Sequence, residues 1–291
     1  MIGSDQKARR SPTIEPTAGV RGLAWRWTGW ASWSVTPAVL VASFVAIALD
    51  VGSAWLGWPS WAIGTVLVSP ALPVCAALVV LVGWTRVGCS RPSLAAWREY
   101  LVGGSLTVLV AALAYAQTIS GWREVEGVTL AAAGEEIVYR LAAVLLIGAT
   151  CARMCGRDWR DTSRWGTGPV VVALVGAALV FSVLPGHVEQ MTGATSIVPF
   201  ASLALLLGYV ALRTGSLLPG VLVHVLLDVI TLAYFAGEVS APERVSIAAT
   251  ALTALVLGFM VAGRRLGLRR LVPSVIDLRH LEPVAHPPAA G

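Results

Sequence analysis

Two glutamates and an arginine interrupt one of the most apolar stretches of the sequence. The stretch contains Gly134-Glu135-Glu136-Ile137-Val138-Tyr139-Arg140. In a helix, Glu136 and Arg140 stack at i, i+4 and can pair, while Glu135 points about 100° away. We therefore predict that Arg140 neutralises and orients Glu136. Glu135, with Tyr139 one turn along, then faces a polar cavity as a base. For this motif alone, a structural ion-paired cluster without chemistry is an equal alternative.

A histidine and an aspartate, one helical turn apart, lie in a second apolar stretch. They are His224 and Asp228, within a segment that begins Ser216-Leu-Leu-Pro-Gly. Their i, i+4 spacing places both on one helix face. Such a pair can bind a metal, polarise a carbonyl oxygen, or hydrogen-bond so that the aspartate fixes the imidazole tautomer. A lone intramembrane histidine is more often a packing residue, but the aspartate and the glutamates favour a site.

The third candidate is His187, which ends the segment Phe181-Ser-Val-Leu-Pro-Gly-His. Taken alone, it is better explained as an interfacial histidine. A carboxylate and two histidines shielded from lipid are suited to activating water and stabilising an oxyanion. The hypothesis is therefore that these residues hydrolyse an amide bond. They do not identify the substrate.

Three other charged residues near the apolar runs are assigned no chemistry. Asp50 is expected to be a buried polar group that bridges helices and is left out of the site. Glu189 is interpreted as a solvated boundary residue, and Arg213 as a cytoplasmic charge that sets topology. The four cysteines follow no zinc or disulfide framework and are given no function.

The composition indicates the environment in which these residues lie. The 291 residues are 56% hydrophobic and only 13% charged, which excludes an ordinary soluble globular protein. The net charge of +5 comes from basic residues that flank apolar runs, so membrane topology explains it better than a nucleic-acid partner. Of the 21 basic residues, 20 are arginine, and this bias hints at a bacterial source.

The apolar runs predict an all-α, polytopic transmembrane bundle of about eight spans with a buried polar active site. The runs cover about 36–57, 62–84, 101–119, 125–148, 168–187, 196–212, 216–236 and 245–263. Arginine and lysine lie mostly before the first run, after the last, and in alternate loops, whereas the opposite loops carry only Arg123 and Arg244. We therefore predict a multi-pass protein of the cell membrane with both termini in the cytoplasm.

The expected organisation has four parts. Residues 1–35 form a cytoplasmic tail with an interfacial segment at 22–33, 36–124 the N-terminal spans, 125–236 the catalytic core, and 237–291 the last span and cytoplasmic tail. Most of the twelve tryptophans lie at predicted boundaries, including Trp30, Trp33, Trp55 and Trp58, and are interpreted as an aromatic belt.

These motifs resemble the CPBP family, the intramembrane type II CAAX prenyl proteases and their bacterial relatives linked to bacteriocin processing and self-immunity (ABI). The resemblance covers roughly residues 125–236. The family's first motif matches Glu135, Glu136 and Arg140, and its last matches His224 and Asp228. Two positions depart from the pattern. Val183 stands where the family usually has phenylalanine, four residues before His187, and Asp228 stands where it often has asparagine.

The resemblance implies a role for each matched residue. Glu135 would be the general base, His187 would help to hold the water, and His224 with Asp228 would stabilise the tetrahedral intermediate. In a rival version, Glu135, His187 and His224 bind a zinc ion that activates the water. An ionised Asp228 would repel an oxyanion, so it must be protonated, act through His224, or help to bind metal.

The leading interpretation is an intramembrane endopeptidase that cleaves a peptide or a membrane-anchored protein within the bilayer. A prenylated substrate is one option among several. The main alternative is a noncatalytic membrane regulator or bacteriocin-immunity protein that uses the same fold for binding. A proton-coupled transporter is the weakest reading, because the sequence lacks broken helices in two matching halves.

Overall fold

The computed structural model describes residues 25–26, 30–87, 122–189, 197–235 and 274–275, with a few positions between 237 and 249. The predicted span at 101–119, nearly all of that at 245–263 and most of the N-terminal tail lie outside these residues. Within them the protein is mostly helical. Short strands β1 (Trp25–Arg26) and β4 (Ser274–Val275) pair antiparallel in a unit separate from residues 27–273.

The first predicted span is a single helix, α1 (Pro37–Leu56). The Thr36 side chain caps it by accepting a hydrogen bond from the Val39 backbone N–H at 3.2 Å, and Pro37 occupies the first turn, where no N–H is needed. Gly57 ends the helix in the left-handed region, at φ 65°. At about 1.5 Å per residue, its 20 residues reach across a hydrocarbon core of about 30 Å.

The second predicted span, 62–84, is wrong as a single helix. Its first part is a hairpin of β2 (Trp61–Ile63) and β3 (Val66–Val68), and only α2 (Leu72–Val82) is helical. Gly64 turns the hairpin at φ 63°, and Pro73 lies in the first turn of α2, where its missing N–H costs nothing. Hydropathy reports how apolar a segment is, but it does not report whether the backbone can form continuous helical hydrogen bonds.

The predicted span at 125–148 is a longer helical rod made of three segments. They are α4 (Trp122–Glu136), the π-helix η1 (Ile137–Ala142) and α5 (Ala143–Met154). In η1 the chain bonds five residues back, so that the Ala143 N–H donates to the Val138 carbonyl. The sequence predicted the helix but not its π segment, and π turns occur often at functional sites.

Four helices complete the described core: α6 (Thr167–Ser182), α7 (Pro185–Glu189), α8 (Ile197–Thr214) and α9 (Leu218–Phe235). They correspond to the predicted runs 168–187, 196–212 and 216–236. The first of these runs divides at Val183 and Leu184, because Pro185 lacks an N–H and cannot continue α6.

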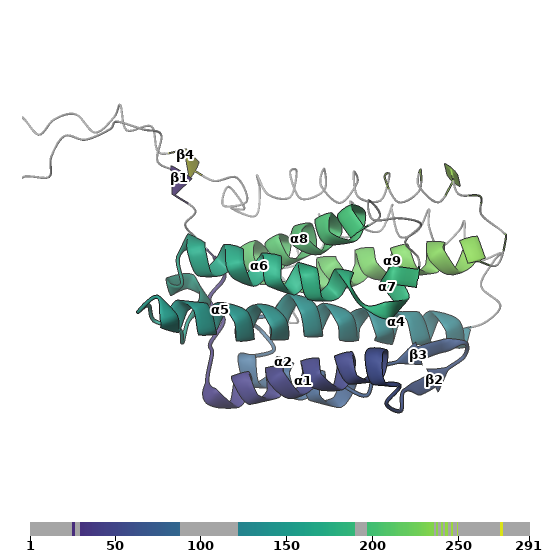
Figure 1. Ribbon diagram of the computed structural model, residues 1–291, viewed down its shortest axis with the longest axis horizontal. Coiled ribbons are helices and arrows are strands. Elements are labelled where there is room, and N and C mark those ends of the chain that lie inside the picture. The colour runs from purple at the N-terminus through teal and green to yellow at the C-terminus, as the bar shows by residue number, and fades with distance from the viewer. Residues whose placement is uncertain are drawn as a thin grey trace, which may run out of the picture. The chain divides into compact units, whose positions relative to one another are not determined.

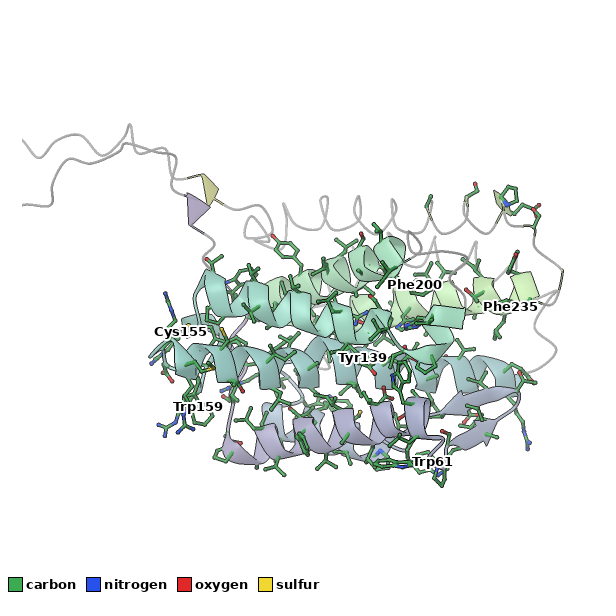
Figure 2. The ribbon with its side chains drawn as sticks, in the orientation of Figure 1. Trp61, Tyr139, Cys155, Trp159, Phe200 and Phe235 are labelled. Carbon is green, nitrogen blue, oxygen red and sulfur yellow. The ribbon has the colours of Figure 1, made fainter. Side chains whose placement is uncertain are left out.

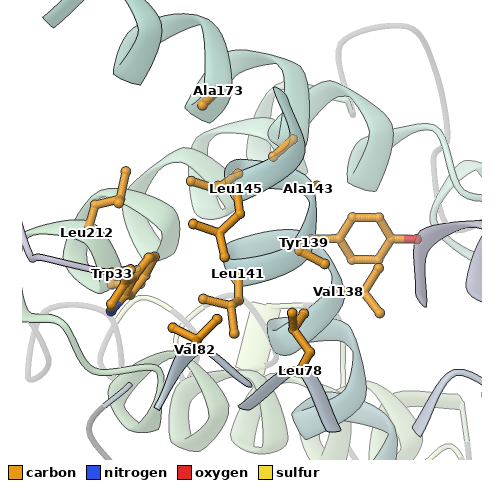
Figure 3. Close-up of a cluster of buried hydrophobic side chains, with 14 of the residues drawn as sticks. Trp33, Leu78, Val82, Val138, Tyr139, Leu141, Ala143, Leu145, Ala173 and Leu212 are labelled. Atoms are coloured by element: carbon orange, nitrogen blue, oxygen red, sulfur yellow. The ribbon is translucent and has the colours of Figure 1, made fainter. Parts of the chain in front are cut away.

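The long rod lies in the middle of the bundle, with α1 and α2 on one side and α6, α8 and α9 on the other (Figure 1). Side chains from all three layers fill the interior (Figure 3). Leu78 of α2, Leu141 and Leu145 of the rod and Leu212 of α8 are fully buried. The rod is therefore in contact with every layer that could position a residue of the site.

Trp30 and Trp33 were predicted in an interfacial aromatic belt, but both are buried. Residues 30–36 form an extended strap held by hydrogen bonds rather than a helix. The Trp33 indole N–H donates to the Arg86 carbonyl at 2.9 Å, and the Val35 N–H donates to the Arg160 carbonyl at 2.8 Å. Trp55 and Trp58, farther on, are about half exposed, as the belt requires.

Two helical stretches are long and apolar enough to cross a membrane, namely Pro37–Leu56 and Glu126–Met154. Four shorter apolar helices accompany them among the described residues. Large apolar side chains such as Phe44, Leu179 and Phe235 are exposed on the outer faces, as expected for contact with lipid. The count of eight spans stays a prediction.

Candidate active site

Three buried ionisable side chains form a continuous chain from the rod to α9. Arg140 Nη2 lies 3.3 Å from Glu136 Oε1, and the same oxygen lies 3.0 Å from His224 Nδ1. All three residues are at least 95% buried. A carboxylate accepts hydrogen bonds and does not donate them, so Glu136 fixes the proton on Nδ1 of His224. The predicted pairing of Glu136 with Arg140 is present.

The start of α9 has no side chain where it faces the Glu136 carboxylate. A Cβ atom added to Gly220 would lie 2.4 Å from Glu136 Oε2, much closer than two such atoms can approach. Glycine at 220 thus allows α9 to pack directly against the buried carboxylate. This contact sets the position of His224, one helical turn farther along α9.

The other nitrogen of His224 faces two further carboxylates. Nε2 lies 3.6 Å from Glu135 Oε2 and 3.6 Å from Asp228 Oδ1. The Glu135 and Asp228 side chains are 29% and 37% exposed, whereas Glu136 is 1% exposed. These separations are too long for direct hydrogen bonds, so Nε2 can still bond to a water molecule or a substrate oxygen. Three of the four predicted site residues therefore meet at the Nε2 side of the imidazole ring.

One predicted role changes as a result. Asp228 was a candidate to fix the imidazole tautomer of His224, but Glu136, on the rod, holds the ring nitrogen Nδ1 instead. Spacing along one helix identified the nearer neighbour in sequence, whereas the partner at hydrogen-bonding distance comes from another helix.

Tyr139 does not face a cavity with Glu135. Its ring is fully buried and its hydroxyl donates to Asp50 Oδ2 of α1 at 2.5 Å. Asp50 thus bridges two helices, as expected, but its partner is next to the site. The sequence contained one signal for this contact: Asp50 is an acidic residue inside an apolar span, and such a residue requires a polar partner from another span.

The break between α6 and α7 positions His187 beside Phe181. His187 Nδ1 donates to the Phe181 carbonyl at 2.7 Å, and its ring is stacked on Phe200 at 4.8 Å between centroids. The Phe181 and His187 rings are 4.3 Å apart. The phenylalanine, although six residues before the histidine instead of four, therefore contacts it.

Phe181 also contacts the other half of the site. Its ring centroid lies 5.8 Å from that of His224 and 5.3 Å from that of Tyr139, both edge-on, and the Arg140 guanidinium carbon lies 4.3 Å above it. Phe181 is 1% exposed. From the sequence, Phe181 was only the first residue of the segment that ends at His187, because spacing along the chain does not show contacts between helices.

The zinc site of the rival hypothesis stays a prediction. Among the described residues, no three histidine, cysteine, aspartate or glutamate side chains are grouped so that they could hold a metal ion. Glu135 and His224 approach each other, but His187 does not complete a ligand set with them. The side chains of Glu189 and Arg213 lie outside the described residues.

Residues 125–230 match the family model of the Rce1-like type II CAAX prenyl endopeptidases. The chain carries an Rce1-like domain. No curated protein and no solved structure matches the chain. The match confirms the resemblance to the CPBP proteases, and it ends within a few residues of the expected core at 125–236.

The Rce1-like domain runs from α4 into α9 and therefore contains every residue assigned to the site. Its family is membrane-embedded and proteolytic, which agrees with the apolar helices. Helices α1 and α2 lie outside the matched segment, although Asp50 of α1 reaches the rod.

Proposed function

We propose that the protein is an intramembrane endopeptidase that hydrolyses a peptide bond in a peptide or membrane-anchored protein. The observation that carries the proposal is the convergence of Glu135 and Asp228 on Nε2 of His224, while Glu136 holds Nδ1. This arrangement separates a carboxylate that can take up a proton from one that only supports the imidazole ring.

Glu135 is the proposed general base. Its Oε2 atom has no hydrogen-bond partner among the described residues and lies on the side of His224 that faces Asp228. A water molecule held there gives a proton to Glu135 while its oxygen bonds to the substrate carbonyl carbon. The electron pair of the C=O double bond moves to the carbonyl oxygen, which becomes an oxyanion.

His224 is the proposed stabiliser of that oxyanion. In the imidazolium form, Nδ1–H donates to Glu136 while Nε2–H donates to the oxyanion, so the Glu136 carboxylate favours the charge that the step requires. When the tetrahedral intermediate collapses, the C–N bond breaks and Glu135 returns its proton to the leaving amine. Asp228 acts through His224 in this scheme, because its carboxylate faces the same nitrogen.

His187 is proposed to help hold the attacking water. Since its Nδ1–H donates to the Phe181 carbonyl, Nε2 carries the lone pair and can accept a hydrogen bond. Its ring stacks on Phe200, and this contact fixes the direction of that lone pair. Phe200 is labelled near the start of α8 in Figure 2. The eight-span topology, the cytoplasmic termini and the division of the chain into four parts belong to the same proposal.

The test is cleavage of a peptide library and of candidate membrane-anchored substrates by purified protein in detergent. Glu135→Ala and Glu135→Gln are compared with the parent and with Glu126→Gln, an exposed glutamate on the same helix. We expect both Glu135 variants to lose cleavage while they remain folded, and the control to keep it. Cleavage that survives both substitutions would overturn the assignment of the base.

Two further arms separate the alternatives. Because the proposed mechanism activates water with Glu135 and without a metal ion, we expect a chelator to leave cleavage unchanged. A loss of cleavage that only added zinc restores would contradict the mechanism. If the parent protein cleaves nothing but binds a membrane partner in a manner that depends on Glu135, the protein is a binding protein and the endopeptidase proposal fails.

A further inference from the structure

We propose that Asp50, together with Tyr139, is a positioning residue for the general base Glu135. The inference rests on the proposed function and extends its machinery to α1, outside the Rce1-like segment. Asp50 contacts no residue that we assign to catalysis. It acts through the backbone of the rod on which Glu135 stands.

The first observation is that both the hydroxyl and the ring of Tyr139 contact other helices. Its hydroxyl donates to Asp50 of α1, and its ring packs edge-on against Phe181 of α6. The hydroxyl points away from the leucines of the core, toward an N-terminal ribbon (Figure 3). Asp50 is 6% exposed and Tyr139 is fully buried, so water does not compete strongly for this hydrogen bond.

The second observation is where Tyr139 stands in the rod. It lies in η1, which begins directly after Glu136. A π turn contains one more residue than an α turn and is less stable by itself. If η1 relaxed to α geometry, each residue before it would turn by about 100° relative to α5. Glu135 would then leave Nε2 of His224, so whatever holds η1 also holds the base.

A second contact from the N-terminal helices supports the same rod on the other side of Glu135. Cys75 of α2 points its thiol at the Gly134 carbonyl, with 3.9 Å between sulfur and oxygen. Gly134 and Tyr139 flank the two glutamates in sequence. The α1 and α2 layer therefore contacts the rod just before and just after the two carboxylates.

The buried face of α1 explains why the hydrogen bond forms at this position. Val39, Ser43, Ala46 and Asp50 are its buried residues at helical spacing, and the last of them is the only one that carries a charge. A buried carboxylate requires a donor, and Tyr139 provides one. Ser43, two turns earlier, is equally buried and has no hydrogen-bond partner within the described structure, which makes it a matched control.

The experiment measures kcat and KM for Asp50→Leu, Asp50→Asn, Tyr139→Phe and the double variant Asp50→Leu/Tyr139→Phe, with Ser43→Ala as control. We expect Asp50→Leu and Tyr139→Phe each to lower kcat by about tenfold or more, with KM changed by no more than about twofold. Asparagine can accept the tyrosine hydrogen bond, so Asp50→Asn should recover most of kcat. The double variant should be no worse than either single variant.

A merely structural bridge would give another result. The variants would melt at lower temperature, but kcat per folded molecule would equal that of the parent. Alternatively, losses in kcat that multiply in the double variant would show that Asp50 and Tyr139 act independently. Either finding overturns the proposal. Amide hydrogen exchange over residues 137–143 provides a readout that does not require activity, because Asp50→Leu should speed exchange there and Ser43→Ala should not.

These readouts also separate the two proposals. If the parent enzyme is inactive, the endopeptidase proposal fails by itself, and faster exchange in η1 still supports the role of Asp50 in holding the rod. If the parent is active and exchange in η1 is unchanged by Asp50→Leu, only the positioning role is wrong.

Discussion

Glu136 is the residue on which the most buried contacts depend. It faces the Arg140 guanidinium, the His224 imidazole and the bare backbone of Gly220 at once. None of the three nitrogens of Arg140 has another hydrogen-bond partner among the described residues, although its guanidinium lies over the Phe181 ring. Glu136 is thus assigned to the support of charge rather than to proton transfer.

Replacement of Glu136 by glutamine should therefore destabilise the whole protein. The Arg140 charge would stay buried without its counter-ion, which costs about 3–5 kcal/mol when one partner of a buried pair is removed. Chemical unfolding in detergent of Glu136→Gln, beside the exposed Glu126→Gln on the same rod, measures the difference. A loss no larger than that of the control would show that the pair does not support the core.

Asp228 and His224 should respond differently to substitution. Asp228→Asn replaces a carboxylate by an amide that can itself donate to an oxyanion, so its kcat should stay within about tenfold of the parent, or about 1.4 kcal/mol. His224→Ala removes the proposed oxyanion donor and should cost about 100-fold or more in kcat. Equal losses from both substitutions would show that the Asp228 carboxylate is itself required for catalysis.

At the scale of elements, the site depends on how closely α9 approaches the rod. Gly220 is the point of contact, since any side chain there would displace the Glu136 carboxylate. The position is helical and does not have a positive φ, so the requirement is for space rather than for backbone freedom.

Gly220→Ala should consequently lower kcat by about 100-fold, because a shift of about 1 Å in the charged groups is enough for such a loss. Gly168→Ala is the matched control. It also lies in a helix, α6, but a Cβ atom there would meet nothing within 4 Å. If the two variants keep equal kcat values, the rod and α9 are not held at the distance the site requires.

The strap of residues 30–36 contacts the loop between α5 and α6 through a hydrogen bond to a titratable side chain, Asp161. Asp161, in the loop between α5 and α6, accepts hydrogen bonds from Ser163 and from the Ser32 hydroxyl. Burial raises the pKa of Asp161, but these hydrogen bonds and the nearby Arg164 outweigh burial, so its pKa lies below the ordinary value.

A lowered pKa in the folded state means that Asp161 stabilises the protein above the ordinary aspartate pKa. That contribution is lost as the pH falls toward the pKa of the folded state. The Tm of the parent should therefore exceed that of Asp161→Asn at neutral pH, and the gap should close on acidification through the aspartate range. A Tm difference that does not change with pH would show that Asp161 stabilises the protein without help from its negative charge.

At the scale of the whole molecule, the described parts of four arginine-bearing segments lie together at one end of the bundle. Backbone hydrogen bonds join residue 31 to Leu212, residue 35 to Arg160, and Val87 to Leu217. These residues belong to four segments or lie directly beside them: the N-terminal tail, the loops at 85–100 and 149–167, and the connection at 213. The distribution of basic residues predicted all four on the cytoplasmic side. A shared end is what the positive-inside rule requires of them.

We accordingly expect both termini to face the cytoplasm. In a chain without its native cysteines, Gly3→Cys and Ala289→Cys should react with a membrane-impermeant maleimide only from the cytoplasmic side. Ser60→Cys, in the connection between α1 and the hairpin, should react only from the opposite side. Labelling of the two termini from different sides would mean an odd number of spans and a wrong topology.

Most of the candidate residues and several of the helices could be predicted from hydropathy and helical periodicity alone. Charges and histidines are expensive among apolar residues, so Glu135, Glu136, Arg140, His224 and Asp228 stood out wherever they occurred. Helical periodicity then paired Glu136 with Arg140 correctly, because i, i+4 contacts are local. Apolar runs likewise located α1, the rod, α8 and α9 to within a few residues at most of their ends.

Two features could not be predicted from the sequence: which helices meet, and where a backbone departs from a regular helix. The contacts of His224 with Glu136, Tyr139 with Asp50, and Phe181 with His187 each join two different helices. The hairpin at 61–68 is as apolar as a span, and the π turn at 137–142 carries Arg140 where a regular helix could carry it too, so composition indicated neither backbone. Hydropathy reports the environment of a residue, whereas its partners follow from the packing of the whole chain.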